Sequence, residues 1–307
     1  MRIAVTGARG RLGRALLTAF EDSPFAGPFG PIAWGRSQLD LDDPSPAGDL
    51  IDANRVELVI HAAGWTDVDG CARQPELALQ RNGSATGILA EACATRGVDL
   101  VVISTNEVFD GRRTDGRGYA PDDRPDPINA YGVSKLAGER AAAEAWDRPG
   151  AGAGGGRLGI VRTAWLYGPP GNDFPAKILA AADRAAAERA SLRVVADEFG
   201  SPTYSVDLAE GIAQLIASGD VSGRHHLVNS GAVSRAAWAR ELLRVAGIPV
   251  AIEEIPSAAW QRASTPPAWG VLEPTGLPSG EPLRPWREAL ADYLPTLLRD
   301  RAARVGR

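Results

Sequence analysis

The sequence predicts an α/β protein built on a doubly wound parallel sheet, with a second, smaller α/β lobe. Three observations support this prediction. Short apolar runs alternate with alanine- and leucine-rich helical stretches, the apolar runs are nearly continuous, and a glycine-rich turn follows the first of them. Continuous apolar strands are typical of a parallel sheet that helices cover on both faces. A chain of 307 residues is long enough for both units.

The expected elements alternate along the first half of the chain. The predicted strands are Ile3–Val5, Ile32–Trp34, Leu58–His61, Leu100–Ile103 and Leu158–Val161. The predicted helices are Arg11–Phe20, about Pro75–Thr95, and Tyr131 to about Ala145. Segments near Leu192–Val195 and His225–Val228 are expected to return to the main sheet, and the run AGAGGG at 151–156 is expected to form a flexible loop.

The second part of the chain changes character, because prolines cluster near 265–267 and 274–285. We therefore expect two interleaved domains. Residues 1–163, with segments near 190–230, would form the nucleotide-binding domain, and residues 164–190 and 231–307 the substrate-binding lobe.

The composition excludes several classes of protein. A net charge of −5 disfavours nucleic acid as a partner, and no apolar run approaches the ~18 residues of a membrane span. The start MRIAVTG reads as a strand rather than a secretory signal, and two cysteines make no disulfide framework, so we expect a cytoplasmic protein. The three histidines show no metal-ligand spacing, so we predict no metal.

Gly7, Gly10 and Gly13 form a GxxGxxG pattern between the first strand and the first helix. Glycines there permit a tight turn and close approach to a pyrophosphate, which the free N–H groups of the helix would bind. The pattern alone is weak, since chance gives roughly 0.4 matches in a chain this rich in glycine. Its position is what indicates a Rossmann-type dinucleotide site, with a purely structural turn as the alternative.

The end of the second strand distinguishes between the two nicotinamide cofactors. An acidic residue there would bind the ribose 2′-hydroxyl, whereas arginine accommodates a 2′-phosphate. The strand ends at Trp34 and is followed by Arg36 and Ser37, with no carboxylate before Asp40. We predict a preference for NADPH, with NADH as the less favoured cofactor; the alternative is that Arg36 is simply a solvated surface charge.

Tyr131 and Lys135 form YxxxK at the start of a predicted helix. Residues four apart share a helix face, and an ammonium near a phenol lowers the phenol's pKa, which suits a proton donor to a carbonyl oxygen. Only two of 33 basic side chains are lysine, so chance gives roughly 0.03 such matches. Thr105 ends the fourth strand, where open α/β sheets bind ligands. An incidental surface Tyr–Lys pair is the alternative.

Together these residues resemble the extended short-chain dehydrogenases/reductases, and among them the dTDP-4-dehydrorhamnose reductase family. The resemblance covers residues 1–245 well and the tail poorly. It rests on TGARGRLG (6–13), HAAGWTDVD (61–69), STNEVFDG (104–111), NAYGVSKLAGE (129–139), RTAWLYG (162–168), GNDF (171–174) and DEFGSPT (197–203).

The resemblance implies a role for each matched residue. It implies a catalytic triad of Thr105, Tyr131 and Lys135, with Lys135 also holding the nicotinamide ribose. It places Gly7, Arg9, Arg11 and Leu12 at the pyrophosphate turn, where the glycine pattern already puts Gly10 and Gly13. It places Asp40 and Leu41 at the adenine and Ala62, Ala63 and Gly64 beside the cofactor, while Arg36 and Ser37 are expected to hold the 2′-phosphate. It assigns Val68, Trp165, Asn172 and Phe174 to the substrate, although Trp165 and Phe174 could equally be core aromatics. Asn106 and Glu107, which follow Thr105, are further candidates for substrate contact.

Two departures bear on the substrate. Where the family usually reads Ser-Thr-Asp-Tyr-Val-Phe, this chain has Asn106-Glu107 in place of Asp-Tyr. The family's Arg-Pro…Ser-x-Leu stretch appears at 266–272 without its Arg or its Ser. If Glu107 faces the site, it would repel a diphosphate or demand a different hydroxyl pattern.

Three functions follow as hypotheses. The first is reduction of the 4-keto group of dTDP-4-dehydro-L-rhamnose by NADPH. The second keeps the chemistry but uses another nucleotide-linked 4-keto-deoxysugar. The third is a non-catalytic regulatory subunit similar to the methionine adenosyltransferase β subunit, which the intact triad disfavours. A nucleotide sugar is the expected partner, and a homodimer stays open.

Overall fold

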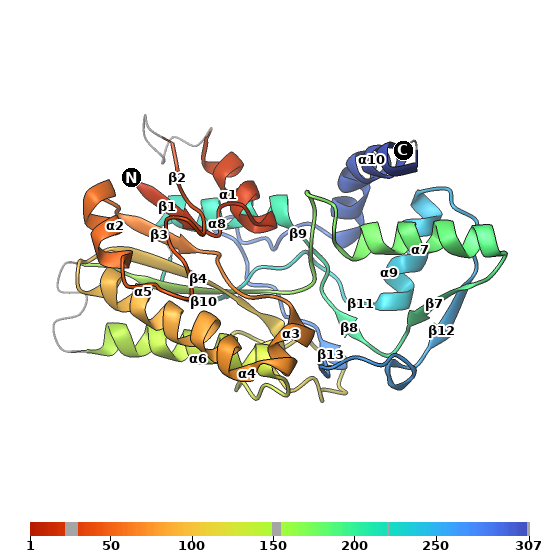
Figure 1. Cartoon of the computed structure of the whole chain (residues 1–307), viewed down its shortest axis with the longest axis horizontal. Coiled ribbons are helices and arrows are strands. Elements are labelled where there is room, and N and C mark those ends of the chain that lie inside the picture. Colours follow the sequence, from red (N-terminus) through yellow and green to blue (C-terminus); the bar gives the residue numbers. More distant parts are fainter. Residues whose placement is uncertain (22–29, 149–154, 220, 306–307) are drawn as a thin grey trace.

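Six parallel strands form the central sheet of the computed structural model, which describes residues 1–21, 30–148, 155–219 and 221–305 (Figure 1). The sheet confirms the predicted fold class. Strand β1 lies between β2 and β3, so the strand order reverses there, and ligands bind at the carboxyl ends beside such a reversal. The strands, from one edge to the other, are β10 (Gly223–His226), β5 (Leu158–Thr163), β4 (Asp99–Thr105), β3 (Leu58–His61), β1 (Ile3–Thr6) and β2 (Ile32–Trp34).

The two segments expected to return to this sheet have different outcomes. Strand β10 pairs in parallel with β5 and becomes the sixth strand. The expectation for 192–195 is wrong, because β7 (Leu192–Val195) pairs instead with β12 (Ile252–Ile255) in the second lobe. The expected glycine-rich loop at 151–156 lies mostly outside the described residues.

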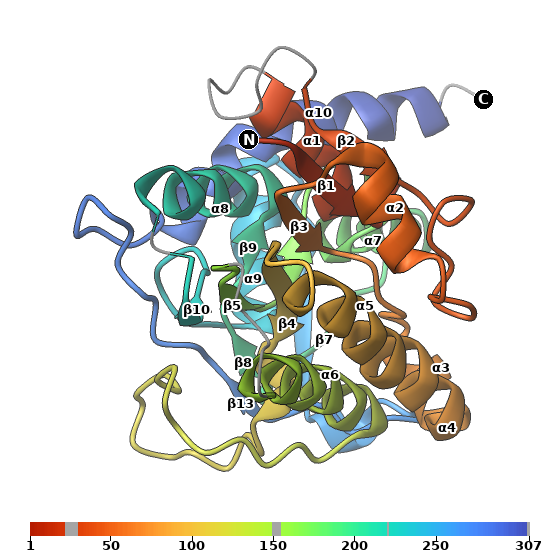
Figure 2. The ribbon, with the colours of Figure 1, turned by 90° about the vertical axis from the view of Figure 1, so that its left-hand side faces the viewer.

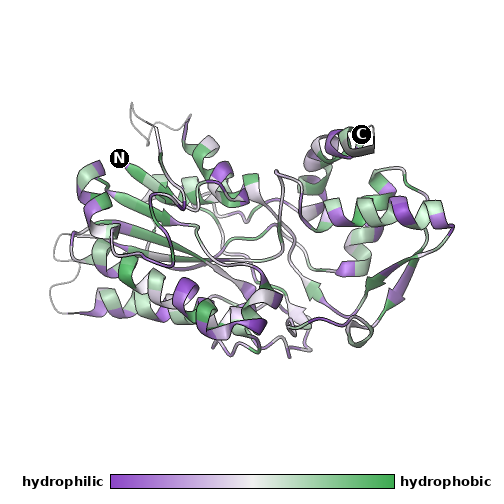
Figure 3. Ribbon diagram, viewed as in Figure 1, coloured by the Kyte–Doolittle hydropathy of each residue, from purple (hydrophilic) through white to green (hydrophobic). Residues whose placement is uncertain are grey.

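Helices cover both faces of the central sheet, as the view along its edge shows (Figure 2). Side chains alternate along β1, so Ile3 and Val5 join the cluster under α1 (Arg11–Glu21) and α8 (Ser205–Ser218), while Ala4 joins the opposite one. The strands are therefore apolar on both sides (Figure 3). The opposite face is covered by α2 (Ala47–Asn54), α5 (Ala85–Ala94) and α6 (Ala130–Asp147).

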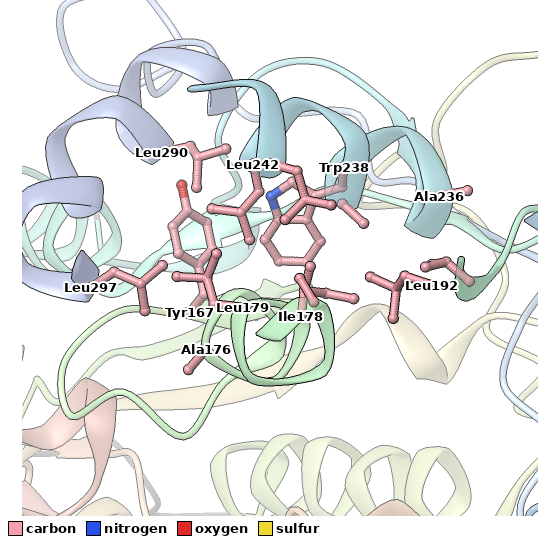
Figure 4. Close-up of a cluster of buried hydrophobic side chains, with 14 of the residues drawn as sticks. Tyr167, Ala176, Ile178, Leu179, Leu192, Ala236, Trp238, Leu242, Leu290 and Leu297 are labelled. Atoms are coloured by element: carbon pink, nitrogen blue, oxygen red, sulfur yellow. The ribbon is translucent and has the colours of Figure 1, made fainter. Parts of the chain in front are cut away.

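The second lobe has its own hydrophobic core. Helix α7 (Phe174–Glu188), α9 (Arg235–Val245) and α10 (Trp286–Val305) pack around Tyr167 and Trp238, with β7 at one side (Figure 4). The remaining short strands connect the lobes: β6 (Leu166–Tyr167), β8 (Phe199–Gly200), β9 (Thr203–Tyr204), β11 (Val233–Ser234) and β13 (Trp269–Gly270).

Helix α6 lies unusually close to its neighbours, and two glycines are the reason. A Cβ on Gly132 would come within 2.0 Å of the Glu107 carbonyl oxygen, and one on Gly138 within 2.3 Å of the Asn82 carbonyl oxygen. Asn129 begins the helix, because its Oδ1 accepts the Gly132 N–H at 2.8 Å. This packing fixes where Tyr131 and Lys135 can point.

The described ranges contain neither a membrane-spanning helix nor a cluster of metal-binding side chains. None of the helices there is long and apolar enough to cross a bilayer. Likewise, no group of three or more His, Cys, Asp or Glu side chains in the described part of the chain could hold a metal ion.

Candidate active site

A groove of about 340 Å³ follows the carboxyl ends of β1, β2 and β3. Its floor needs glycine, because a Cβ on Gly7 would lie 2.8 Å from the Ala63 nitrogen and Gly7 has a φ of +64°. A Cβ on Gly13 would lie 2.2 Å from the Gly7 carbonyl oxygen. The predicted cofactor residues that line the groove are Gly7, Arg9, Gly10, Arg36, Asp40, Leu41, Ala62, Ala63 and Gly64.

One end of this groove is rich in arginine and aspartate. Arg36 Nε donates to Asp40 at 3.0 Å, and its NH2 donates to Asp42 at 2.9 Å. Arg81 also binds Asp42, at 2.6 Å, and lies over the Trp65 ring. The Arg36 side chain is 72% exposed, so a phosphate can reach it. Ser37 does not line the groove and donates to Gln38 instead.

A buried chain of hydrogen bonds holds the loop after β3. The Ala63 N–H donates to Thr6 Oγ1 at 3.0 Å, and the Thr6 hydroxyl lies 2.9 Å from His61 Nδ1. His61 Nε2 lies 3.2 Å from Thr86 Oγ1, and that hydroxyl donates to the Asn82 carbonyl. Burial, and then Lys135, lower the pKa of His61 to about 3, so the ring is neutral. This series of hydrogen bonds holds the loop at 62–64 in place.

Asn82 is a site residue that sequence reasoning missed. It lies in a π-helical turn, η2 (Leu79–Ser84), of the kind that often marks functional positions. Its Oδ1 accepts the Trp65 N–H at 2.7 Å, while its Nδ2 donates to the Trp65 carbonyl and to Ser134 Oγ, both at 3.0 Å. Asn82 thus ties the cofactor loop to α6. Nothing in the sequence marks a π-turn.

Thr105 and Tyr131 lie together at the carboxyl end of β4, and Lys135 lies one helical turn further along α6. Thr105 Oγ1 accepts the Glu107 N–H at 3.2 Å, which begins the short helix η3 (Asn106–Val108). Lys135 is buried, and its Nζ would lie 3.8 Å from a Cβ on Gly64, so the ammonium points at the cofactor loop. Tyr131 lies one helical turn earlier on α6, on the same face.

The protonation of Tyr131 differs from the sequence-based expectation. Burial, and then the Glu107 carboxylate, raise the pKa of Tyr131, while its hydrogen bond with Thr105 opposes the shift. The expected lowering by Lys135 is therefore wrong for this structure. Desolvation also lowers the pKa of Lys135 to about 8. A raised pKa keeps the phenol protonated at neutral pH, the form that a proton donor needs.

A second cavity, of about 620 Å³, lies between the nucleotide-binding sheet and the second lobe. Four cationic side chains, three aromatic rings and three aspartates (Asp67, Asp69 and Asp173) line it. The cations and the rings suit a diphosphate joined to a flat base. The cations are Arg11, Lys177, Arg235 and Arg262, and the rings are Trp165, Phe174 and Trp238. We call this cavity the cationic cleft. The predicted substrate residues Val68, Trp165, Asn172 and Phe174 all line it.

Three residues with predicted ligand contacts point elsewhere. Arg11 leaves the pyrophosphate turn: its Nε donates to the Gly168 carbonyl at 3.0 Å and its NH2 to Asn172 Oδ1 at 2.5 Å, within the cationic cleft. Leu12 is buried in the core beneath α1. Asn106 is buried and donates to the Gly270 carbonyl at 3.1 Å, so it connects η3 to β13.

Trp165 and Phe174 serve both the core and the cleft. Trp165 has a φ of +42°, which is rare outside glycine, and its ring stacks 5.8 Å from Trp238. The Arg235 guanidinium lies 3.8 Å above the centre of the Trp165 ring. Phe174 stacks 4.7 Å from Trp238. The core alternative and the substrate role are thus compatible for both residues.

The cleft contains an ion-pair group that the sequence did not reveal. Glu198 is buried and pairs with Arg235 at 3.5 Å and, more closely, with Arg262. Arginines abound in this chain, so neither could be singled out. Lys177 offered a signal through its rarity, yet its position gave no role. Arg262 lies four residues before Pro266, in the tail that resembled the family poorly.

The groove, the cationic cleft and the residues between them define the class of this protein. A dinucleotide groove beside a Thr–Tyr–Lys set, on a doubly wound parallel sheet, is the arrangement of a short-chain dehydrogenase/reductase.

Comparison with known proteins then gives the family. A profile described as "RmlD substrate binding domain" matches residues 1–299, and the chain belongs to this family. It is 36% identical to a dTDP-4-dehydrorhamnose reductase of Streptomyces griseus, over 96% of this chain and 94% of the relative. It is 34% identical to a dTDP-4-keto-6-deoxy-D-glucose reductase of Streptomyces niveus, over 97% and 98%.

A solved structure supports the same family assignment. The dTDP-4-dehydrorhamnose reductase of Bacillus anthracis, in complex with NADP, is 32% identical, with a TM-score of 0.82 over 95% of this chain and 98% of that one. The resemblance noted in the sequence is confirmed, and it extends through the tail to residue 299.

Proposed function

We propose that this protein reduces the 4-keto group of dTDP-4-dehydro-L-rhamnose with NADPH. One observation carries the proposal. The Lys135 ammonium points at the cofactor loop, and Tyr131 lies one helical turn away beside Thr105. The cationic cleft provides charge for a diphosphate beside this set. The names of relatives that match nearly the whole chain support the choice of substrate.

The residues fit the cofactor, since Gly7 and Gly13 leave a cradle that a side chain would fill. When bound, NADPH supplies the hydride that the carbonyl carbon accepts. Tyr131 gives its phenolic proton to the carbonyl oxygen, and Thr105 orients that oxygen by a hydrogen bond. Lys135 holds the nicotinamide ribose and stabilises the phenolate that remains.

The direct test measures NADPH oxidation, at 340 nm, with enzymatically prepared dTDP-4-dehydro-L-rhamnose. The proposal expects turnover with one NADPH consumed for each sugar reduced. No turnover at micromolar enzyme, with NADPH binding intact, would contradict it and would favour the regulatory alternative.

A second candidate keeps the chemistry and changes the sugar. Glu107 stands where the family usually has tyrosine, and it interacts electrostatically with Tyr131, Arg235 and Arg262. A different charge beside the reacting group favours a different pattern of sugar substituents. The name of the Streptomyces niveus relative fits such a change. Faster turnover of another dTDP-4-keto-6-deoxysugar would support this candidate.

The replacement of Arg36 by alanine tests the preference for NADPH. We expect the KM for NADPH to rise about 10-fold, because a charged hydrogen bond to the 2′-phosphate is lost, while the KM for NADH changes less than about 2-fold. Asp40 and Asp42 already neutralise part of the Arg36 charge, so the rise in the KM for NADPH should not be much larger than this.

Arg148→Ala is a matched control, because Arg148 forms an exposed pair with Glu91 and lies outside the groove. It should leave both KM values unchanged. An equal loss with both cofactors in Arg36→Ala would rule out a phosphate-reading role.

The pH dependence tests Lys135. Burial lowers its pKa to about 8, so in the free enzyme it loses its charge as the pH rises through about 8. We expect kcat/KM for NADPH to fall above that pH, whereas Tyr131 stays protonated because its pKa is raised. Lys135→Arg should move the descending limb well upward, and Lys177→Arg should leave it near 8. If Lys135→Arg does not move the descending limb of the pH profile, a group other than Lys135 causes the fall in kcat/KM.

A cytoplasmic setting and a homodimer belong to the same proposal. Cys71 and Cys93 are free and buried, as suits a reducing compartment. Sedimentation of the purified protein would establish whether it forms dimers.

A further inference from the structure

Glu107 lies between two members of the catalytic set. Its backbone N–H donates to Thr105 Oγ1 at 3.2 Å. Its carbonyl oxygen lies so close to α6 that a Cβ on Gly132, the residue after Tyr131, would be 2.0 Å away. The backbone of Glu107 is therefore fixed against both the strand end that carries Thr105 and the helix that carries Tyr131.

The side chain of Glu107 is held in one direction. Asn129 Nδ2 donates to Glu107 Oε2 at 2.7 Å and to the Thr265 carbonyl at 3.1 Å. Asn129 is itself fixed as the N-cap of α6. Within the described part of the chain, Oε1 has no hydrogen-bond donor of its own. Glu107 as a whole is half buried, and Oε1 keeps its capacity to accept a hydrogen bond.

The surroundings of Glu107 are polar and carry compensating charge. Burial raises the pKa of Glu107, while the hydrogen bond from Asn129 and the charges of Arg235 and Arg262 oppose that rise and favour the carboxylate. The buried Glu198 pairs with both arginines. Ser264, next to Thr265, is buried, and its hydroxyl finds no partner among the residues that the structure describes. The two arginines offset the repulsion that Glu107 would exert on a diphosphate, so the carboxylate is compatible with a nucleotide sugar.

We propose that Glu107 determines sugar specificity by accepting a hydrogen bond from the hydroxyl on the carbon next to the reacting carbonyl. In a 4-keto-6-deoxysugar that carbon is C3, because the other neighbour, C5, carries the methyl group and the ring oxygen. The site therefore takes sugars that keep the 3-hydroxyl and rejects 3-deoxy sugars. This inference rests on the proposed function and names the sugar class within it.

The hydrogen bond that Glu107 Oε1 would accept sets the expected discrimination between the two sugars. A hydrogen bond to a charged group changes an equilibrium about 10- to 100-fold, and a site built to bind a hydroxyl discriminates more strongly against its absence. Wild type should therefore prefer the 3-hydroxyl sugar to its 3-deoxy counterpart by about 100-fold in kcat/KM.

The test compares Glu107→Gln and Glu107→Leu, which has a similar length and no acceptor, with wild type on dTDP-4-dehydro-L-rhamnose and its 3-deoxy counterpart. Glu107→Gln is isosteric and keeps an acceptor for Asn129, so it should fold. Both variants should lose about 10- to 100-fold in kcat/KM for the 3-hydroxyl sugar, and less than about 3-fold for the 3-deoxy sugar. The KM for NADPH should not change. Glu241→Gln is the matched control and should resemble wild type, because Glu241 is a half-buried carboxylate on α9 that pairs with Arg244, outside the groove and the cationic cleft.

The outcomes separate the two proposals. Equal losses on both sugars, or wild-type discrimination below about 3-fold, would overturn the specificity role while reduction itself stands. A changed KM for NADPH would show that the variants disturb the cofactor site, which also contradicts it. No turnover of either sugar by wild type would overturn the proposed function and this inference with it.

Discussion

Replacing Tyr131 with phenylalanine is expected to lower kcat about 10³-fold and to change the Kd for NADPH less than about 3-fold. The phenol is the proton donor in the proposed reaction, and general acid catalysis contributes about 10²- to 10⁴-fold. Its raised pKa means that the donor is protonated over the whole neutral range. The ring of phenylalanine keeps the packing, so the cofactor groove should stay intact. Stopped-flow single turnovers and fluorescence titration of NADPH measure the two quantities.

Tyr119→Phe provides the control for this experiment. The Tyr119 hydroxyl donates to Asp110 at 2.6 Å, and the ring stacks on Phe109, outside both the groove and the cationic cleft. Its kcat should stay within about 2-fold of wild type. Turnover by Tyr131→Phe at the wild-type rate would assign the proton transfer to another group.

Replacing Glu139 with alanine is expected to remove about 3–5 kcal/mol from the free energy of unfolding. Arg162 and Glu139 are 1% and 3% exposed and form two hydrogen bonds, at 2.9 and 2.7 Å. Ser104 also donates to Glu139. The variant leaves the Arg162 charge buried without its partner, and that uncompensated charge is the cause of the loss. Urea unfolding followed by circular dichroism measures it.

Two further variants test whether burial of the ion pair causes this loss of stability. Glu91→Ala removes the partner of Arg148 in an exposed pair and should cost less than about 1 kcal/mol. The double variant Glu139→Leu, Arg162→Met should recover at least half of the loss, because no unpaired charge remains. A loss from Glu139→Ala no larger than that from Glu91→Ala would contradict this account.

The parts that could be predicted from sequence are those set by local spacing. Nearly continuous apolar runs predicted the strands at 3–5 and 58–61, because both faces of a covered sheet must be apolar. The glycines at 7, 10 and 13 predicted the cradle, since only glycine tolerates the backbone contact at Gly7. The spacing of Tyr131 and Lys135 predicted a shared helix face. Each of these signals lies within a few neighbouring residues.

The directions of long side chains could not be predicted in the same way. Arg11 follows the glycine turn in the sequence, yet its guanidinium binds the segment at 168–172. Arg235 and Arg262 join Glu198 over separations of 37 and 64 residues. In a chain where nearly every cation is arginine, no local pattern distinguishes these from solvated ones.

Residue spacing was enough to predict the first five strands of the sheet, the phosphate cradle and the helix face shared by Tyr131 and Lys135, because strand and helix periodicity and glycine sterics act locally. Only the tertiary structure shows that β7 leaves the main sheet, that Asn82 ties the cofactor loop to α6, and that Asn129 binds the Glu107 carboxylate. It also reversed the expected shift in the pKa of Tyr131. That pKa depends on desolvation and on charges brought together from distant segments, and these exist only once the chain has folded.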